Sequence, residues 1–217
     1  MRLFLSSYRA GSHSAELLKL VGSIRKVAII SNAKDYKNSD ERAKSMQENF
    51  DFWRSIGIEP TEIDLRPYFH KDGAAKLLND FEFVWLAGGN AFLLRRALKY
   101  SGMDKYLIEK VRSGALIYGG ESAGAIMAAP SLRGSEDASS PDHEDDPDYT
   151  PDPYEREVLW GGLGLIDFVL VPHYKNPNIG DSIDGYVDYL RENNIDFDTI
   201  REEEAYIVNG DKTEFIR

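Results

Sequence analysis

The sequence predicts a single α/β domain built around a mostly parallel sheet with helices on both faces. Short apolar runs alternate with helical patterns along most of the 217 residues, and this alternation is typical of parallel sheets. The run Lys26–Ser31 is continuous and rich in β-branched residues, as expected of a strand buried on both faces. Apolar residues make up 42% of the chain, enough for a sizeable core, which excludes a disordered chain.

The first third of the chain supplies strands and helices in turn. Strands are expected at Met1–Ser6, Lys26–Ser31 and Pro60–Leu65. Apolar residues recur at helical spacing over Ser14–Val21, Ser39–Ile56 and Ala74–Phe81, which predicts helices there. Ser39 is the expected N-cap of the long helix, because a serine hydroxyl can accept a hydrogen bond from the first free N–H groups.

Two further strands each lead into a glycine-containing turn. The strand Phe83–Leu86 precedes Ala87-Gly88-Gly89-Asn90, and the strand Ala115–Tyr118 precedes Gly119-Gly120-Glu121-Ser122-Ala123-Gly124. Helices are expected at Ala91–Tyr100, Lys105–Arg112 and Ala125–Ala129.

The last third begins with an acidic segment that lacks periodicity. We interpret residues 135–158 as a long loop inserted in one domain that spans residues 1–217. A buried strand over Gly162–Pro172 then ends at His173, and a helix is expected over Ile183–Asn193. The segments Tyr206–Val208 and Thr213–Ile216 flank Asn209-Gly210, which predicts a hairpin with a type I′ turn.

The charge balance excludes several classes of function. With 37 acidic and 26 basic residues the net charge is −11, so neither nucleic acid nor an anionic membrane is an expected partner. The absence of cysteine excludes disulfides, cysteine zinc sites and a cysteine nucleophile. The apolar stretch Leu3–Leu5 is too short for a signal peptide, and no segment approaches the ~20 apolar residues of a membrane span. We therefore expect a soluble cytoplasmic protein.

The segment Gly120–Gly124 has the pattern G-x-S-x-G between a strand and a helix. This context is typical of a nucleophile elbow, in which a strained turn exposes the serine hydroxyl at the carboxyl edge of a sheet. The N–H groups and the dipole of the following helix would stabilise an oxyanion. The alternative is a glycine-bracketed turn with Ser122 as an ordinary N-cap.

A serine nucleophile needs a base, and His173 is the best placed of four histidines. It follows a buried strand, at the sheet edge where sites of α/β proteins lie. His13 and His70 are expected on the surface, and His143 lies in the acidic loop. The carboxylate that would orient the base is not distinguished by spacing, because acidic residues are plentiful.

The turn after the strand Phe83–Leu86 is a second candidate element of the site. Its backbone N–H groups could form half of an oxyanion hole, and the N–H of Ala123 would supply the other half. The alternative is a tight strand-to-helix turn in which Asn90 caps the helix.

Three motifs together resemble the peptidase E family, whose relatives include cyanophycinase. They are Ala87-Gly88-Gly89-Asn90-Ala91, Gly120-Glu121-Ser122-Ala123-Gly124-Ala125 and Pro172-His173-Tyr174, in an order and spacing that fit over most of the chain. The resemblance implies a flavodoxin-like three-layer sandwich related to class I glutamine amidotransferase domains. Those enzymes use a cysteine at the elbow, whereas this chain has Ser122, so a glutaminase of that type is disfavoured.

The resemblance also implies a set of site residues. Ser122 and His173 carry over directly, and Glu202 matches the late acidic residue of the triad, with Glu203 and Asp137 as alternatives. Gly88 and Gly89 are placed at the oxyanion hole. Asn90 and Arg133 are the expected substrate-binding residues, since peptidase E cleaves dipeptides with an N-terminal aspartate and needs a cation to bind it. The alternative for Arg133 is a surface arginine paired with Glu136 or Asp137.

Two features depart from peptidase E. Glu121 stands where peptidase E has an apolar aromatic residue, and its carboxylate would repel an acidic substrate unless it points away. The acidic stretch Asp142–Asp148 lengthens the segment between Ser122 and His173 and would weaken the attraction of such a substrate.

The expected function is hydrolysis of small peptides, with Asp-Xaa dipeptides as candidate substrates, by a serine peptidase without metal or other cofactor. Monomer and homodimer are both left open. One alternative is an esterase that uses an acid in the loop, such as Asp152, and another is a non-catalytic protein that binds a small ligand on the same fold.

Overall fold

Seven strands form the central sheet of the computed structural model, in the order β3-β2-β4-β5-β1-β8-β9. The structure describes residues 1–138, 148–179 and 181–217. In sheet order the strands are β3 (Glu59–Ile63), β2 (Lys26–Ile30), β4 (Phe83–Leu86), β5 (Ile117–Glu121), β1 (Arg2–Ser6), β8 (Ala205–Asn209) and β9 (Lys212–Ile216).

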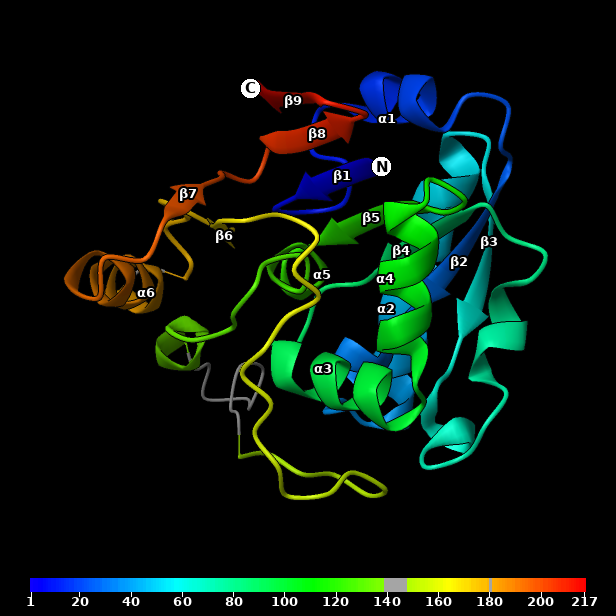
Figure 1. The fold of residues 1–217 in the computed structure, drawn as a ribbon, viewed down its shortest axis with the longest axis horizontal. Helices are drawn as coiled ribbons and strands as arrows, with labels where there is room; N and C mark the ends of the chain where they lie inside the picture. Colours follow the sequence, from blue (N-terminus) through cyan, green and yellow to red (C-terminus); the bar gives the residue numbers. More distant parts are fainter. Residues whose placement is uncertain (139–147, 180) are drawn as a thin grey trace.

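Five neighbouring strands of this sheet run parallel, and a hairpin completes one edge. β2 pairs in parallel with β3 and β4, and β5 pairs in parallel with β4 and β1. β8 is antiparallel to β1, and β9 is antiparallel to β8 (Figure 1). The predicted α/β fold with a mostly parallel sheet and a terminal hairpin is confirmed.

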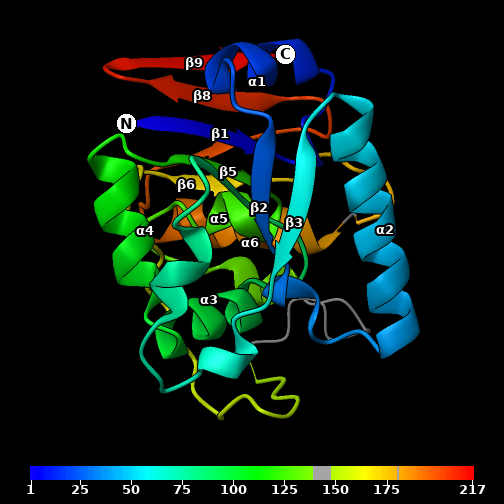
Figure 2. The same ribbon diagram turned by 90° about the vertical axis from the view of Figure 1, so that its right-hand side faces the viewer.

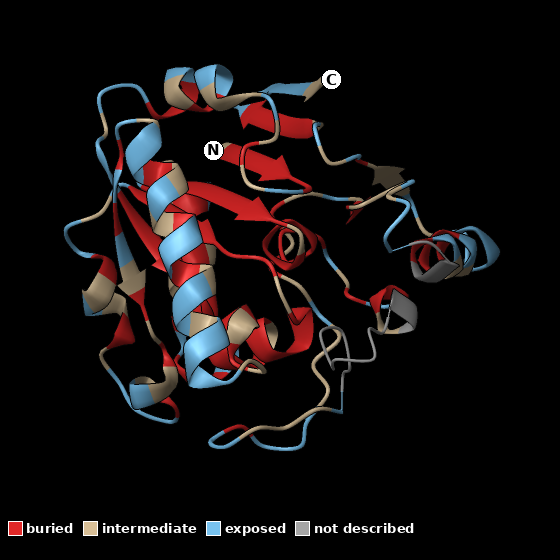
Figure 3. Cartoon of the chain, turned by 180° about the vertical axis from the view of Figure 1, so that it is seen from behind, coloured by how far each residue is buried: buried red, intermediate tan, exposed pale blue. Residues whose placement is uncertain are grey.

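Helices cover both faces of the sheet and give three layers (Figure 2). The helices are α1 (Ser14–Val21), α2 (Ser39–Ser55), α3 (Ala91–Tyr100), α4 (Met103–Arg112), α5 (Ala123–Ile126) and α6 (Asp181–Glu192). One core holds apolar residues of α1 and α2, and includes Trp53 and Trp85 with ring centroids 4.9 Å apart. The other core holds residues of α3, α4, α5 and α6. Figure 3 shows α2 with its outer face exposed, as expected of an amphipathic surface helix, whereas β4 and β5 are buried along their whole length.

A second, two-stranded sheet lies beyond the carboxyl ends of β1 and β5 (Figure 1). It pairs β6 (Val169–Val171) in parallel with β7 (Phe197–Thr199), and α6 forms the crossover between them. The predicted strand over Gly162–Pro172 is therefore wrong in length. Residues 162–165 instead donate backbone hydrogen bonds to carbonyls of residues 127–130, which directly follow α5, so only Val169–Val171 remains to pair with β7.

Three local predictions are also corrected. Asn38, not Ser39, caps α2, because the Asn38 side chain accepts from the N–H groups of Asp40 and Glu41. The segment Ala74–Phe81 forms a 3-10 helix over Ala74–Leu78 rather than an α-helix. The helix predicted over Ala125–Ala129 is one turn, Ala123–Ile126.

The hairpin between β8 and β9 also differs from the prediction. Asn209 pairs with Lys212, so the turn residues are Gly210 and Asp211. Gly210 has φ +65° and Asp211 is not among the residues with positive φ. A positive φ at the first central residue alone is the pattern of a type II′ turn, not type I′.

The acidic insertion is described only at its two ends. Ser135–Ala138 forms a 3-10 turn, and residues 148–158 are irregular. The residues between them, with His143, lie outside the described part of the chain. Among the described residues there is no helix with both the length and the apolar character needed to span a membrane.

Candidate active site

Ser122 stands at a sharp turn between β5 and α5. Its backbone has φ +49° and ψ −115°, a conformation that residues with a Cβ atom adopt rarely and that is typical of strained functional positions. The N–H of Ser122 donates to the carbonyl of Ser6 at the end of β1, with a distance of 3.0 Å. The strand-to-helix context predicted for the elbow is therefore present.

Glycines on both sides of Ser122 make this turn possible. A Cβ atom on Gly120 would lie 2.4 Å from the carbonyl oxygen of Gly124, and one on Gly124 would lie 2.1 Å from that of Leu86. The buried hydroxyl of Tyr118 donates to the Gly124 carbonyl with a distance of 2.6 Å. The elbow is thus fixed by close backbone packing that side chains would prevent.

The structure brings Ser122, His173 and Glu202 into one chain of contacts. Ser122 Oγ lies 2.9 Å from His173 Nε2, and His173 Nδ1 lies 2.8 Å from Glu202 Oε1. Each separation is a hydrogen-bond distance. A hydroxyl, an imidazole and a carboxylate in this order can transfer a proton from the hydroxyl to the imidazole.

Parallel pairing of β6 with β7 brings the His173 imidazole and the Glu202 carboxylate together. The N–H of Ile200 donates to the carbonyl of Val171, and the N–H of Tyr174 donates to that of Ile200, at 2.9 and 3.1 Å. His173 and Glu202 follow these paired segments and meet at their carboxyl ends. β7 was not predicted, because its three residues, Phe-Asp-Thr, carry almost no strand signal.

The other acids proposed for the triad do not contact His173 among the described residues. Glu203 is exposed to solvent. Asp152 is also exposed, within the irregular end of the insertion at residues 148–158. The side chain of Asp137 lies outside the part of the chain that the structure describes.

Hydrogen bonds keep the Glu202 carboxylate ionised. Burial raises the pKa of this group. The opposing effect is larger and comes from the hydrogen bonds with His173, Asn176 and Ser7 and from the charge of His173, so the pKa lies below its ordinary value. An ionised carboxylate accepts a hydrogen bond from the N–H group at Nδ1. The unprotonated Nε2 is then available to act as a base.

The turn after β4 lies directly against Ser122. A Cβ atom on Gly88 would be 3.0 Å from the Cβ of Ser122, and one on Gly89, which has φ +134°, would be 2.3 Å from the carbonyl oxygen of Ala33. Among the described residues, no acceptor is recorded for the N–H groups of Gly88, Gly89 or Ala123. Because α5 is a single turn, these N–H groups themselves, rather than a helix dipole, are the available oxyanion donors.

Comparison with known proteins identifies the family of the chain. The sequence model of peptidase family S51 matches residues 6–216. The chain belongs to peptidase family S51. Peptidase E of Streptomyces coelicolor is 33% identical over 156 residues, which cover 69% of this chain and 58% of that protein. An uncharacterised peptidase of Listeria innocua is 34% identical over 121 residues, covering 56% of this chain and 52% of the relative. The matched part of the chain thus spans little more than half the length of these relatives.

Solved structures share the fold. The structure of a candidate peptidase E from Listeria monocytogenes EGD-e superposes with a TM-score of 0.76 at 22% identity and covers 100% of this chain and 98% of that one. A peptidase from an acI-B1 actinobacterium gives a TM-score of 0.67 at 15% identity, covering 99% of this chain and 86% of the other.

Glu121, which precedes Ser122 in this S51 chain, points away from Ser122. Its carboxylate is buried and accepts from the backbone N–H of Arg9 at 2.5 Å and from Asn49 Nδ2 at 3.3 Å. Asn49 belongs to α2, on the face of the sheet that holds the Trp53 core. The carboxylate therefore meets the condition stated above for an acidic substrate, since it points away from Ser122.

The two expected substrate-binding residues lie in different environments. Asn90 is completely buried, and its Oδ1 caps α3 by accepting from the N–H of Leu93 at 2.8 Å. Arg133 is exposed, with its guanidinium carbon 4.4 Å from the ring centroid of Trp160. Glu136, one suggested partner of Arg133, accepts instead from the N–H of Gly134. A role for Asn90 or Arg133 in substrate binding stays a prediction.

Two residues of the candidate site were not singled out from the sequence. Ser7 follows β1, and its Oγ lies 3.2 Å from both His173 Nδ1 and Glu202 Oε2. Asn176 donates to Glu202 Oε1 through Nδ2. The position of Ser7 at the carboxyl end of a predicted strand was the available signal, since Ser122 follows a neighbouring strand of the same direction.

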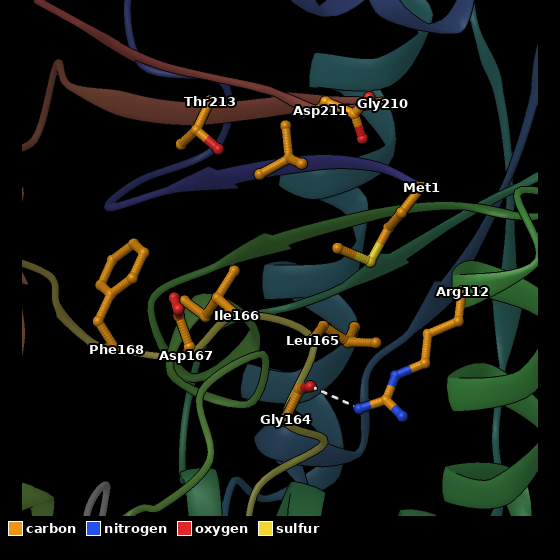
Figure 4. Close-up of a pocket in the computed structure, with 11 residues that line it drawn as sticks. Met1, Arg112, Gly164, Leu165, Ile166, Asp167, Phe168, Gly210, Asp211 and Thr213 are labelled. Carbon is orange, nitrogen blue, oxygen red and sulfur yellow. Dashed lines mark hydrogen bonds between the residues drawn. The ribbon is translucent and has the colours of Figure 1, made fainter.

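A pocket at the opposite edge of the sheet is separate from this constellation (Figure 4). It has a volume of about 410 Å³ and includes Met1 at the start of β1 and Gly210 in the hairpin turn. Arg112 Nη2 donates to the Gly164 carbonyl at its rim, with a distance of 2.9 Å. Because β1 and β5 carry Ser7 and Ser122 at their other ends, this pocket contributes nothing to the candidate active site.

Proposed function

We propose that this chain is a serine peptidase that hydrolyses small peptides through a covalent acyl-enzyme. Membership of family S51 supports the reaction class. The observation that carries the assignment of residues is the continuous contact from Ser122 Oγ to His173 Nε2 at 2.9 Å and from His173 Nδ1 to Glu202 Oε1 at 2.8 Å.

In the proposed mechanism, His173 removes the proton of Ser122 as Oγ attacks the carbonyl carbon of the scissile bond. Glu202 holds the imidazole with Nδ1 protonated and stabilises the imidazolium. The N–H groups of Gly88, Gly89 and Ala123 bind the oxyanion. His173 then gives its proton to the leaving amine, and a water molecule repeats the attack on the acyl-enzyme and releases Ser122.

For the substrate, we propose dipeptides with an N-terminal aspartate. The similarity to peptidase E of Streptomyces coelicolor supports this choice. Arg133 is exposed, and its planar guanidinium can bind a carboxylate through two parallel hydrogen bonds. The Glu121 carboxylate is bound by Arg9 and Asn49 on the other face of the sheet, so it does not face a substrate bound at Ser122.

The experiment compares release of chromophore from aspartyl, alanyl, leucyl and arginyl anilides by the wild type and by Ser122→Ala. We expect selective cleavage of the aspartyl anilide and a loss of about 10⁴-fold or more in turnover in the variant. Cleavage of another anilide that depends on Ser122 would retain the mechanism and reject the aspartyl specificity.

A serine-directed phosphonate provides the second arm of the test. Stoichiometric labelling of Ser122 in the wild type, without labelling of Ser122→Ala, is expected for an activated nucleophile. No cleavage of any anilide together with no labelling would favour a non-catalytic ligand-binding protein. Cleavage of ester substrates alone would favour an esterase.

A further inference from the structure

A buried serine outside the proposed triad contacts two of its members. Ser7 is completely buried and is the first residue after β1. Its Oγ lies 3.2 Å from His173 Nδ1, 3.2 Å from Glu202 Oε2 and 2.8 Å from the backbone nitrogen of His173. One hydroxyl therefore touches the main chain of the base, the ring of the base and the carboxylate that orients it.

These three contacts use the full hydrogen-bonding capacity of a hydroxyl, which is one donor and two acceptor lone pairs. An ionised carboxylate can only accept, so the Ser7 O–H donates to Glu202 Oε2. The backbone N–H of His173 can only donate, so it occupies one lone pair of Oγ. The remaining lone pair faces His173 Nδ1.

These hydrogen-bond roles of Ser7 Oγ determine which nitrogen of the His173 imidazole carries the proton. If Nδ1 carried no proton, its lone pair would face a lone pair of Ser7 Oγ and also Glu202 Oε1 at 2.8 Å. With the proton on Nδ1, both contacts are attractive. Nε2 is then the unprotonated nitrogen, and it lies 2.9 Å from Ser122 Oγ.

The backbone of His173 gives Ser7 a second effect. His173 has φ +61°, a left-handed conformation that is unfavourable for a residue with a Cβ atom. The hydrogen bond from its N–H to Ser7 Oγ opposes relaxation of this backbone, which would move the ring away from Ser122.

From these contacts we propose that Ser7 is a positioning residue that holds His173 in the Nδ1-protonated tautomer and aligns it between Glu202 and Ser122. The proposal rests on the function proposed above for these three residues. Ser7 touches neither the substrate nor the reacting bond and acts only through His173 and Glu202.

Ser101, directly after α3, is a matched control outside the site. It is also buried, and its Oγ donates to the main-chain carbonyl of Ala97 within α3 at 2.7 Å. Ser101→Ala and Ser7→Ala therefore each remove one buried hydroxyl, and only Ser7→Ala removes contacts with the triad.

The test combines kinetics with NMR spectroscopy of protein that carries ¹⁵N-labelled histidine. In Ser7→Ala we expect kcat to fall on the order of 10- to 100-fold with KM nearly unchanged. The ¹⁵N signals of His173, assigned by their loss in His173→Gln, should indicate the Nδ1–H tautomer in the wild type and a mixture of tautomers in Ser7→Ala. Ser101→Ala should keep the wild-type tautomer and kcat.

Two results would overturn the proposal. One is a wild-type tautomer and kcat in Ser7→Ala, and the other is an equal loss of kcat in both variants that follows their loss of Tm. Should Ser7→Ala not fold, Ser7→Cys keeps the volume with a weak donor and acceptor, and the same change of tautomer is expected. The NMR arm needs no substrate, so it decides the role of Ser7 even if the wild type cleaves none of the anilides.

Discussion

At the scale of single residues, the site depends on one carboxylate in a cluster of three. Glu202, Glu203 and Glu204 are consecutive, yet only Glu202 contacts His173 among the described residues. The three side chains have the same chemistry, so the difference between them comes from direction alone.

The first prediction compares adjacent carboxamide variants. Glu202→Gln should lower kcat on the order of 10³- to 10⁴-fold, because a carboxamide neither stabilises the imidazolium nor fixes its tautomer. Glu203→Gln, at an exposed position, should change kcat less than twofold. Steady-state kinetics with the best anilide measures both, and equal losses would reject Glu202 as the orienting acid.

The second prediction concerns the pH dependence of stability. The pKa of Glu202 lies below its ordinary value of 4.5 in the folded protein, so the unfolded chain binds the proton first as the pH falls. The stabilisation is present in full above pH 4.5 and is lost as the pH falls through the lower folded value.

Urea unfolding of the wild type and Glu202→Gln between pH 7 and pH 3 measures this contribution. The difference in free energy of unfolding should stay constant above about pH 5 and decrease below it. Glu203→Gln should give no such trend. A difference between wild type and Glu202→Gln that is independent of pH would contradict the prediction.

The third prediction concerns the glycine turn after β4. In Gly89→Ala the new Cβ would meet the Ala33 carbonyl at 2.3 Å in a backbone with φ +134°. The variant should lose roughly 2 kcal/mol or more of stability, and displacement of the oxyanion donors should lower kcat about 10²-fold.

Gly114→Ala is the control, because it introduces the backbone strain of a positive φ without steric overlap. Gly114 has φ +81° with nothing within 4 Å of a new Cβ. It should lose about 1–2 kcal/mol and keep its kcat. Full activity in Gly89→Ala would mean that the turn does not supply the oxyanion donors.

At the scale of elements, a buried arginine ties the segment after the acidic insertion to the helix that follows the glycine turn. Arg96 of α3 is completely buried and donates to the carbonyls of Phe92, Tyr149 and Glu155. Tyr154 of the same segment donates to Asp35 Oδ2 at 2.6 Å. These contacts hold an irregular segment in place without a strand or a helix.

The fourth prediction tests this attachment with Arg96→Met. Because methionine cannot donate to these carbonyl groups, the free energy of unfolding should fall by about 2–4 kcal/mol. Residues 148–158 should then become a site of limited proteolysis. Tyr154→Phe removes a single hydroxyl and should cost about 1–2 kcal/mol with less cleavage. Equal resistance of wild type and Arg96→Met to protease would show that Arg96 does not hold the segment.

At the scale of the whole molecule, the sheet separates two cores that share its strands. Leu17 of α1 lies in one core and Leu107 of α4 lies in the other, and both are completely buried. Successive side chains of each central strand point alternately into one core and the other. We therefore expect the two cores to unfold together.

The fifth prediction therefore concerns cooperativity and tests the single domain expected over 1–217. Calorimetry should show one transition with an enthalpy of about 150 kcal/mol near 60 °C. Leu17→Ala and Leu107→Ala should each cost about 2–5 kcal/mol and lower the same Tm. Separation into two transitions in either variant would indicate two domains.

The sequence by itself determined the elements whose signals are local. Apolar runs predicted the parallel strands β1, β2, β4 and β5, and helical spacing predicted α1 and α3 to the residue. The glycines around Ser122 predicted the elbow, because a sharp backbone turn leaves no room for Cβ atoms. Only the tertiary structure distinguished Glu202 from Glu203, brought Ser7 to His173, and turned Glu121 away from the site. These are contacts between segments far apart in the chain, and β6–β7 pairing and sheet order fix them through hydrogen bonds that leave no periodic pattern in the sequence.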